Sequence, residues 1–224
     1  MFVVVLTLLV IFFLWNSAQQ RSRRMAVSWV VDMLHGARNE VGDGRVLPVP
    51  VFYDEKGDEL YSWRYFINVL NTGSAKPSTP LLLKWDSEEA RHLRTTVHPL
   101  FCGSDSSDTT IMAVTGEGTA FDLHRRTSSW EELDDDTILI VDFFGVDTMW
   151  AQPGDISLGE IASQVTLNKW GRGVANDVTV GFADGKAWTL SGDTPTSVLR
   201  PFLLVEEAFH HEREIELLPY RVGE

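Results

Sequence analysis

The chain opens with an uninterrupted apolar run, MFVVVLTLLVIFFLW, at residues 1–15. A helix of this length is about 22 Å long at 1.5 Å per residue, which is shorter than the ~30 Å hydrocarbon core of a bilayer. Asn16, Ser17 and Ala18 can extend the helix before the first arginine, Arg21. The pattern therefore predicts a transmembrane anchor over residues 1–18, helped by partner helices or by local thinning of the bilayer.

A cleaved signal peptide and a buried core helix are the two alternatives for this run. A signal peptide needs basic residues before its apolar segment, and none precedes this one. A core helix would show a polar face, and it would not be followed directly by Arg21, Arg23 and Arg24. The positive-inside rule places these arginines, and the following domain, in the cytoplasm.

The helical periodicity continues beyond the arginines. Apolar residues at helical spacing predict a stalk over residues 19–44, which ends at Gly42 and Gly44. We expect these residues to form one apolar stripe along the helix: Met25, Trp29, Val30, Met33, Leu34 and Ala37.

Short extended and helical segments alternate over residues 45–204 and predict one globular domain of the α+β class, built on an antiparallel sheet. Strands are expected at IMAV (111–114) and TILIVDFF (137–144), and Ser62 is expected to cap a short helix. Two further strands flank Asp184-Gly185, the preferred pair for a type I′ turn, in which both central residues have positive φ. The charged residues 205–224 predict a solvated helical tail.

Charge is distributed unevenly along the chain. The formal net charge is −13, although residues 1–25 contain three arginines and no acid, so the remainder holds 16 basic residues against 32 acidic ones. Such an acidic domain is repelled by nucleic acid, which is therefore excluded as an expected partner. The single cysteine, Cys102, cannot form an intrachain disulfide.

One group of carboxylates is a candidate calcium site. Asp134, Asp135 and Asp136 follow Glu131 and Glu132, and carboxylate oxygens are the ligands that calcium prefers. A helix end followed by a turn explains the same acids without an ion, so no cofactor is required by the pattern.

Two other constellations were weighed as sites. Trp150, Trp170 and Trp188 could line a sugar-binding groove, although core packing is the default for tryptophan. Asp142 and Asp147 could act as paired carboxylates of a hydrolase, but no motif fixes two acids in one geometry. The sequence therefore predicts a protein without catalytic activity.

Seven short motifs follow one another in an order that resembles one known family, the planctomycete pseudopilin-like family called domain of unknown function 1559. The likeness covers residues 10–204. It rests on SWR (62–64), WDS (85–87), FCGS (101–104), VTGEGTAF (114–121), DDTILIVDF (135–143), WAQPGDI (150–156) and FADGKAWTL (182–190).

The resemblance implies a pilin-like fold, in which a long N-terminal helix packs on an antiparallel sheet. It also implies a structural subunit of type II secretion or pilus-like machinery, with the domain in the periplasm or otherwise outside the cytoplasm, opposite to what the arginines predict. The family's Gly-Phe processing site and the Glu after it are absent, and its motif histidine and second cysteine fall on Val174 and Val27. A membrane-tethered module that binds a ligand or carbohydrate is the alternative function.

Overall fold

The computed structural model describes residues 2–37, 47–71, 84–95, 97–102, 108–122, 129–171 and 176–223, and for residues 2–16 it describes the side chains of Thr7, Ile11, Leu14 and Trp15 only. The predicted helix end at Gly42 and Gly44, and the position of Val174, lie outside this part. The fold is α+β, as the sequence predicts. In chain order its elements are α1 (Phe2–Ala37), β1 (Val51–Tyr53), β2 (Glu59–Ser62), α2 (Trp63–Asn71), α3 (Arg91–Thr95), β3 (Ile111–Thr115), β4 (Ile138–Asp142), β5 (Ile156–Ser157), α4 (Leu158–Ala162), β6 (Val178–Phe182), β7 (Ala187–Leu190), α5 (Thr196–Leu203), α6 (Val205–Ala208) and α7 (Arg213–Glu216).

Five strands form the central sheet in the order β5-β3-β4-β6-β7. Neighbouring strands are antiparallel, except that β5 pairs parallel to β3 through Val114↔Ile156. The prediction of a purely antiparallel sheet is therefore wrong at this edge, where a strand of two residues leaves no periodic pattern in the sequence. The strands β1 and β2 pair separately as a two-stranded sheet.

The β6–β7 hairpin is confirmed, but its turn differs from the predicted type I′. The Gly185 amide donates to the Phe182 carbonyl at 3.0 Å, and Gly185 has φ +87°. Asp184 does not have positive φ, because Asn176 is the one non-glycine residue in the described segments that does. The geometry matches a type I turn followed by a left-handed glycine, which forms a bulged hairpin loop.

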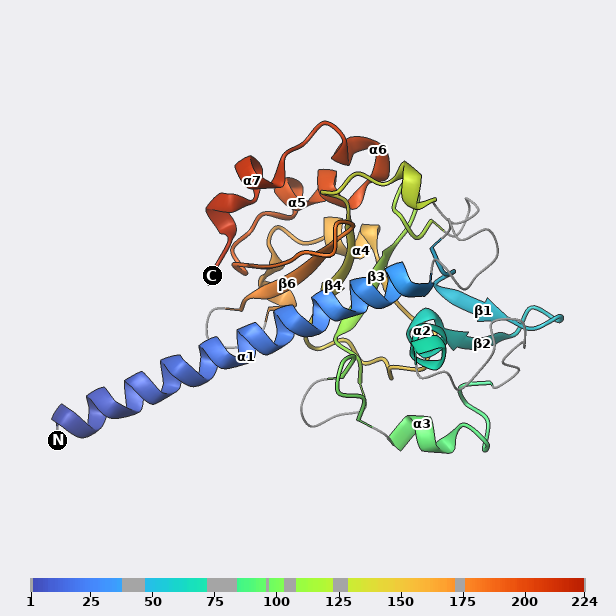
Figure 1. Ribbon diagram of the computed structural model, residues 1–224, viewed down its shortest axis with the longest axis horizontal. Coiled ribbons are helices and arrows are strands. Elements are labelled where there is room, and N and C mark those ends of the chain that lie inside the picture. The colour runs from blue at the N-terminus through green and yellow to red at the C-terminus, as the bar shows by residue number, and fades with distance from the viewer. Residues whose placement is uncertain are drawn as a thin grey trace.

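The two faces of the sheet bury separate apolar cores. In β3, Ile111 and Ala113 belong to the core beneath α1, whereas Met112 and Val114 belong to the core beneath α5. This alternation follows from the pleat of a strand, which directs successive side chains to opposite faces. Figure 1 shows α1 along one side of the sheet and α5 to α7 on the other.

The C-terminal residues are part of the domain, so the prediction of a solvated tail over residues 205–224 is wrong. Ala208, Arg213 and Leu217 are buried, and the Val222 amide donates to the Thr189 carbonyl of β7 at 2.9 Å. The segment forms short helices rather than one, α6 over Val205–Ala208 and α7 over Arg213–Glu216.

Candidate functional site

Helix α1 has two dissimilar halves. Its C-terminal half packs on the sheet, while its N-terminal half projects beyond the rest of the domain (Figure 1). In the projecting half Ile11, Leu14 and Trp15 are 56%, 67% and 60% exposed. Large apolar side chains with that much exposure make this half of α1 a candidate surface for contact with a partner or a lipid phase.

The predicted single stripe on this helix is wrong, because the apolar residues divide between two faces. Val30, Leu34 and Ala37 are buried against the domain, whereas Met25 and Trp29 are more than half exposed. A second line of exposed residues repeats at alternating spacings of four and three, which keeps it on one face of a helix. This line, the α1 stripe, consists of Ile11, Trp15, Ala18, Ser22, Met25 and Trp29.

Polar contacts fix the C-terminal half of α1 to the domain. Arg23 donates from Nε and Nη2 to the two oxygens of Asp142 at 2.6 and 2.5 Å, and from Nη1 to the Cys102 carbonyl at 3.2 Å. Burial alone would lower the pKa of Arg23, but the Asp142 carboxylate outweighs it and the pKa is raised. Further along, Ser28 Oγ donates to the Gly185 carbonyl at 2.7 Å.

The arginines after the apolar run therefore differ in role. Arg23 holds Asp142, Arg24 donates to the Gly223 carbonyl, and Arg21 is exposed. Two of the three thus have a structural use that competes with their interpretation as a signal of membrane orientation. The predicted anchor at residues 1–18 has most of its side chains outside the described part. Among the residues described, no helix is both long and apolar enough to cross a membrane.

A buried arginine brings together two of the sequence motifs. Arg64 is fully buried, and its guanidinium donates to the carbonyls of Trp150, Gln152 and Gly154 at 2.8–3.0 Å and to Asp155 Oδ1 at 2.7 Å. The SWR motif therefore clamps the WAQPGDI loop. This clamp is structural, because the Arg64 and Asp155 side chains are buried and Arg64 donates to Asp155 and to the loop carbonyls rather than to solvent.

The neighbouring residues complete the clamp. Asp155 Oδ1 also accepts from Trp63 Nε1 at 3.1 Å and from the Ala113 amide at 2.8 Å. Ser62 does not cap α2 as predicted. Its hydroxyl donates to the Trp150 carbonyl at 3.0 Å, and its amide donates to the Ala151 carbonyl.

One of the candidate calcium ligands, Asp136, binds an arginine of the C-terminal segment through its carboxylate. The Arg213 amide donates to Asp136 Oδ2 at 2.9 Å, and Asp134 Oδ1 accepts from the Asp136 amide. The side chain of Arg213 forms ion pairs with Asp136 and Asp184. In the described part of the chain, no three His, Cys, Asp or Glu side chains are grouped as a metal site would require. The three candidate ligands thus have different contacts: the Asp136 carboxylate pairs with Arg213, Asp135 accepts from Arg213 through its backbone carbonyl, and Asp134 accepts from the Asp136 amide.

The hairpin residue Asp184 has an electrostatic role as well as a conformational one. Burial alone would raise the pKa of Asp184, but hydrogen bonds from Arg213 and Lys186 outweigh it and lower the pKa to about 2. Arg213 also lies over the Phe182 ring, with its guanidinium carbon 4.5 Å from the ring centroid. Sequence reasoning missed this cluster, since Arg213 lies far along the chain from both of its carboxylates.

The other candidate residues are placed in the core or apart from one another. Trp150, Trp170 and Trp188 are 2%, 4% and 2% exposed, so the proposal that they line an open groove is wrong. Asp142 is occupied by Arg23, whereas Asp147 is exposed. An acid whose two oxygens are bonded to a guanidinium is poorly suited to transfer a proton.

Cys102 lies beside an aromatic box around His98. The thiol is buried, and burial raises its pKa. The His98 ring lies 4.7 Å from Phe101 and 4.8 Å from Trp150 between centroids. Its Nδ1 accepts from the Leu100 amide at 3.3 Å, so Nε2 carries the proton and donates to Asn68 Oδ1 at 3.0 Å. The ring is therefore held in the neutral form.

Acidification is expected to weaken the fold through His98. Burial lowers the pKa of His98 from 6.5 to about 4, so the unfolded chain binds the proton more readily between these values. Stability is complete above pH 6.5 and falls toward pH 4, by about 1–2 kcal/mol once solvent screening of this half-buried ring is allowed for. Urea unfolding at a series of pH values measures the slope.

The His98→Phe variant retains an aromatic ring but cannot titrate, so its stability should depend less on pH in this interval. His210→Gln, which removes an exposed histidine, serves as the control and should keep the parent slope. A His98→Phe variant with an unchanged slope would show that other groups cause the acid sensitivity.

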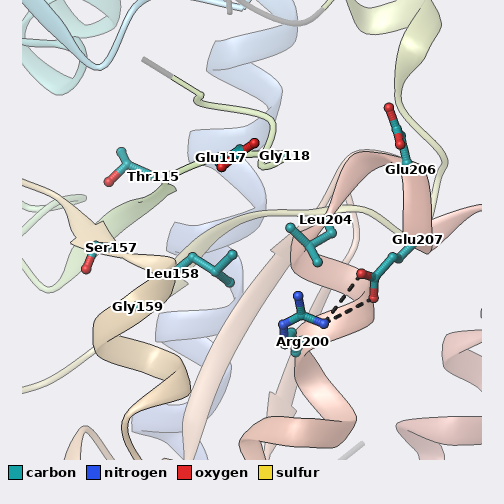
Figure 2. A pocket seen from close by; sticks show the side chains of 11 residues that line it. Thr115, Glu117, Gly118, Ser157, Leu158, Gly159, Arg200, Leu204, Glu206 and Glu207 are labelled. Carbon is teal, nitrogen blue, oxygen red and sulfur yellow. Dashed lines mark hydrogen bonds and ion pairs between the residues drawn. The ribbon is translucent and has the colours of Figure 1, made fainter. Parts of the chain in front are cut away.

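The described surface also contains an open cleft of about 540 Å³, where the ends of β3 and β5 meet α5 and α6 (Figure 2). Its walls come from three separate segments of the chain, around residues 115–118, 157–159 and 200–207. Leu158 and Leu204 provide apolar surface, while Glu117, Glu206 and Arg200 provide charge. The size lies within the range of small-ligand pockets.

The exposed α1 stripe and the cleft are thus two candidate binding surfaces of the described residues, whereas the clamps of Arg64 and Arg213 are buried. Comparison with known proteins adds no further guide, since no protein-family model, no curated protein and no solved structure matches the chain.

Proposed function

We propose that the chain is a membrane-anchored, pilin-like structural subunit without catalytic activity. One observation carries the proposal: α1 continues as a single helix from the core of the domain into a projecting half with exposed apolar side chains. A helix fixed to a domain at one end transmits position and force from whatever holds its other end. The uncharged sequence of residues 1–15 favours lipid as that surrounding.

The α1 stripe suggests how copies of the chain associate. Its lower part, Met25 and Trp29, lies beside the domain and beyond the apolar run, where water would otherwise surround it. Alternating spacings of four and three are those of helices that pack side by side. We therefore propose that residues 1–18 lie in the bilayer and that Met25 and Trp29 contact α1 of a neighbouring copy.

The family resemblance supports the same assignment and adds a setting. The resemblance implies an association with secretion or pilus-like machinery and a domain that lies outside the cytoplasm. The contacts of Arg23 and Arg24 weaken the opposing argument from the positive-inside rule. Both residues are bonded to the domain, so each has a structural use apart from membrane orientation. The acidic domain is also better placed away from anionic lipid.

Flotation of the full chain with phosphatidylcholine vesicles tests the anchor. We expect the parent protein to float with the vesicles and the double variant Ile11→Asp/Leu14→Asp to lose at least about tenfold in bound fraction, because two charges enter the apolar phase. The matched control is Val165→Asp/Phe209→Asp, which makes the same change at two exposed apolar positions of the domain. If both double variants float equally, the α1 anchor is excluded.

The contact between copies is tested separately. Met25→Asp/Trp29→Asp should float like the parent chain but should sediment as a monomer in nonionic detergent, where the parent protein forms larger species. If the parent chain is monomeric under the same conditions, Met25 and Trp29 do not form a subunit contact. This result would not bear on the proposed anchor.

A further inference from the structure

Three arginines gather where α1 leaves the domain, and they carry an inference that rests on the proposed anchor and deepens it. Arg21 and Arg24 are three residues apart on α1, so their side chains are neighbours on one face of the helix. The C-terminal segment lies beside this part of α1 (Figure 1), where Arg24 donates to the Gly223 carbonyl. Together with Arg221 of that segment, Arg21 and Arg24 form what we call the arginine patch.

The third arginine joins the patch from the edge of the sheet. Arg221 forms an antiparallel bridge with Leu190 at the end of β7. The next residue, Val222, donates from its amide to the Thr189 carbonyl at 2.9 Å. The guanidinium carbon of Arg221 lies 4.5 Å from the centroid of the Trp188 ring. This side chain is therefore held in place before any ligand arrives, which limits the entropy that binding would cost.

The described residues leave the charges of the arginine patch without a counter-ion. Arg24 is bonded to a neutral carbonyl, Arg221 Nε is buried without a hydrogen-bond partner, and Arg21 is exposed. The nearby Gln20 donates to Asp177, so this acid is bonded to an amide rather than to the patch. Burial, and then the charges of Arg221 and Arg21, lower the pKa of Arg24. An anion among the three side chains would relieve this repulsion.

With residues 1–18 in the bilayer, as proposed, the arginine patch lies at the depth of the lipid headgroups. Arg21 and Arg24 follow Ala18 by about 4.5 and 9 Å along the helix. The headgroup layer extends ~5–8 Å beyond the hydrocarbon core, and an arginine side chain is long enough to reach back toward it. Both arginines lie about 100° around the helix from the α1 stripe, because each precedes a member of the stripe by one position. Lipid and a neighbouring copy would therefore occupy different faces of α1.

We propose that the arginine patch binds the phosphate group of an anionic phospholipid. Arginine suits this ligand, because its planar guanidinium can donate two parallel hydrogen bonds to phosphate oxygens. An acidic surface of a neighbouring copy is the other candidate occupant, since the formal net charge of the chain is −13. Lipid is favoured because Arg21 follows the proposed membrane segment within one turn of helix.

Native mass spectrometry of the full chain tests the proposal, with equal amounts of dioleoyl phosphatidylglycerol and dioleoyl phosphatidylcholine added in nonionic detergent. The parent protein should retain more phosphatidylglycerol, by at least about tenfold. Arg21→Gln changes an exposed side chain and should lower this excess about fivefold, the contribution of one arginine near an anionic surface. Arg221→Gln should lower it in the same direction. Arg91→Gln, which removes an exposed arginine of α3, is the control and should keep the parent ratio.

Each other outcome overturns the inference. Equal retention of the two lipids by the parent protein would show that the headgroup charge is not recognised, and an equal fall in Arg91→Gln would show that the effect is not local. Displacement of phosphatidylglycerol by an equal amount of inorganic phosphate would make the patch a site for free phosphate. If Arg21→Gln keeps the lipid ratio but loses the larger species in sedimentation, the patch binds a neighbouring copy.

Failure of this inference is distinguishable from failure of the anchor. Phosphatidylcholine vesicles carry no net charge, so flotation with them does not require the arginine patch. A chain that floats but retains the two lipids equally keeps the anchor and loses the lipid site. A chain that prefers phosphatidylglycerol but does not float keeps the lipid site and loses the anchor.

Discussion

Replacing Arg64 with methionine is expected to lower the free energy of unfolding by about 3–5 kcal/mol, the largest single effect in the molecule. The variant leaves Asp155 buried without its cation, and it removes the Arg64 donor from the Gln152 and Gly154 carbonyls, while the Trp150 carbonyl keeps the Ser62 hydroxyl. Removing one partner of a buried ion pair costs this much because the remaining charge is uncompensated. Denaturant unfolding of the full chain, followed by tryptophan fluorescence, measures the loss.

Arg64→Lys should recover only part of the stability, since one ammonium group cannot reach the four acceptors that the planar guanidinium spans. Arg91→Met is the control: Arg91 lies in α3 and pairs with Glu88, and both side chains are more than 70% exposed. An exposed pair contributes less than about 1 kcal/mol, so this variant should unfold almost like the parent. Equal losses in the Arg64 and Arg91 variants would contradict the structural role of the clamp.

The sequence predicts the elements whose pattern is local. The strands β3 and β4 coincide with the expected apolar runs, and the β6–β7 hairpin forms around Asp184-Gly185. Such segments are recognised because β-branched residues in short runs favour extended backbone whatever they pack against. The exact turn was missed because the hairpin closes with a three-residue loop, in which the Phe182 amide donates to the Lys186 carbonyl at 2.9 Å, whereas the type I′ turn has two residues.

Features that depend on tertiary contacts were not predictable. The apolar positions of α1 repeat at one period, but only packing decides that Val30 and Leu34 face the domain while Met25 and Trp29 face outward. The tryptophans proposed as ligand contacts are core residues for the same reason. Nothing in a short window distinguishes a tryptophan that packs from one that binds.

The cleft illustrates the same limit. Its three walls are separated by long stretches of chain, so no spacing rule in the sequence predicts that residues 115–118, 157–159 and 200–207 line one cleft. The one signal present was Gly116-Glu117-Gly118, a pair of glycines around an acid within a quoted motif. The contacts of the buried clamp were likewise not predictable, although both motifs that it joins, SWR and WAQPGDI, are recognisable in the sequence. In the fold the two motifs form one buried contact, in which Arg64 of SWR donates to Trp150 and Asp155 of WAQPGDI.

Gly181→Val is expected to destabilise the protein by about 2 kcal/mol and to loosen α1 from the sheet. A Cβ at this position would lie 2.8 Å from Ile140 Cγ1, 2.8 Å from Val27 Cγ1 and 2.9 Å from Val31 Cγ2. Valine gains up to about 1 kcal/mol in strand preference over glycine. This gain is outweighed, because overpacking a tight core costs about 1–3 kcal/mol or more.

The sign of the stability change in Gly181→Val follows from the stiffness of the side chains around Gly181. Val27 and Val31 are β-branched residues within a helix, where one side-chain rotamer dominates, so their methyl groups can withdraw only if α1 itself moves. Gly36→Ala is the matched control on the same helix: its Cβ would meet no atom within 4 Å, so a stability gain of up to about 1 kcal/mol is expected. Hydrogen exchange of the amides of residues 26–37 should rise in Gly181→Val and not in Gly36→Ala. If Gly181→Val unfolds like the parent and protects these amides equally, the close approach of α1 to β6 does not hold α1 to the domain.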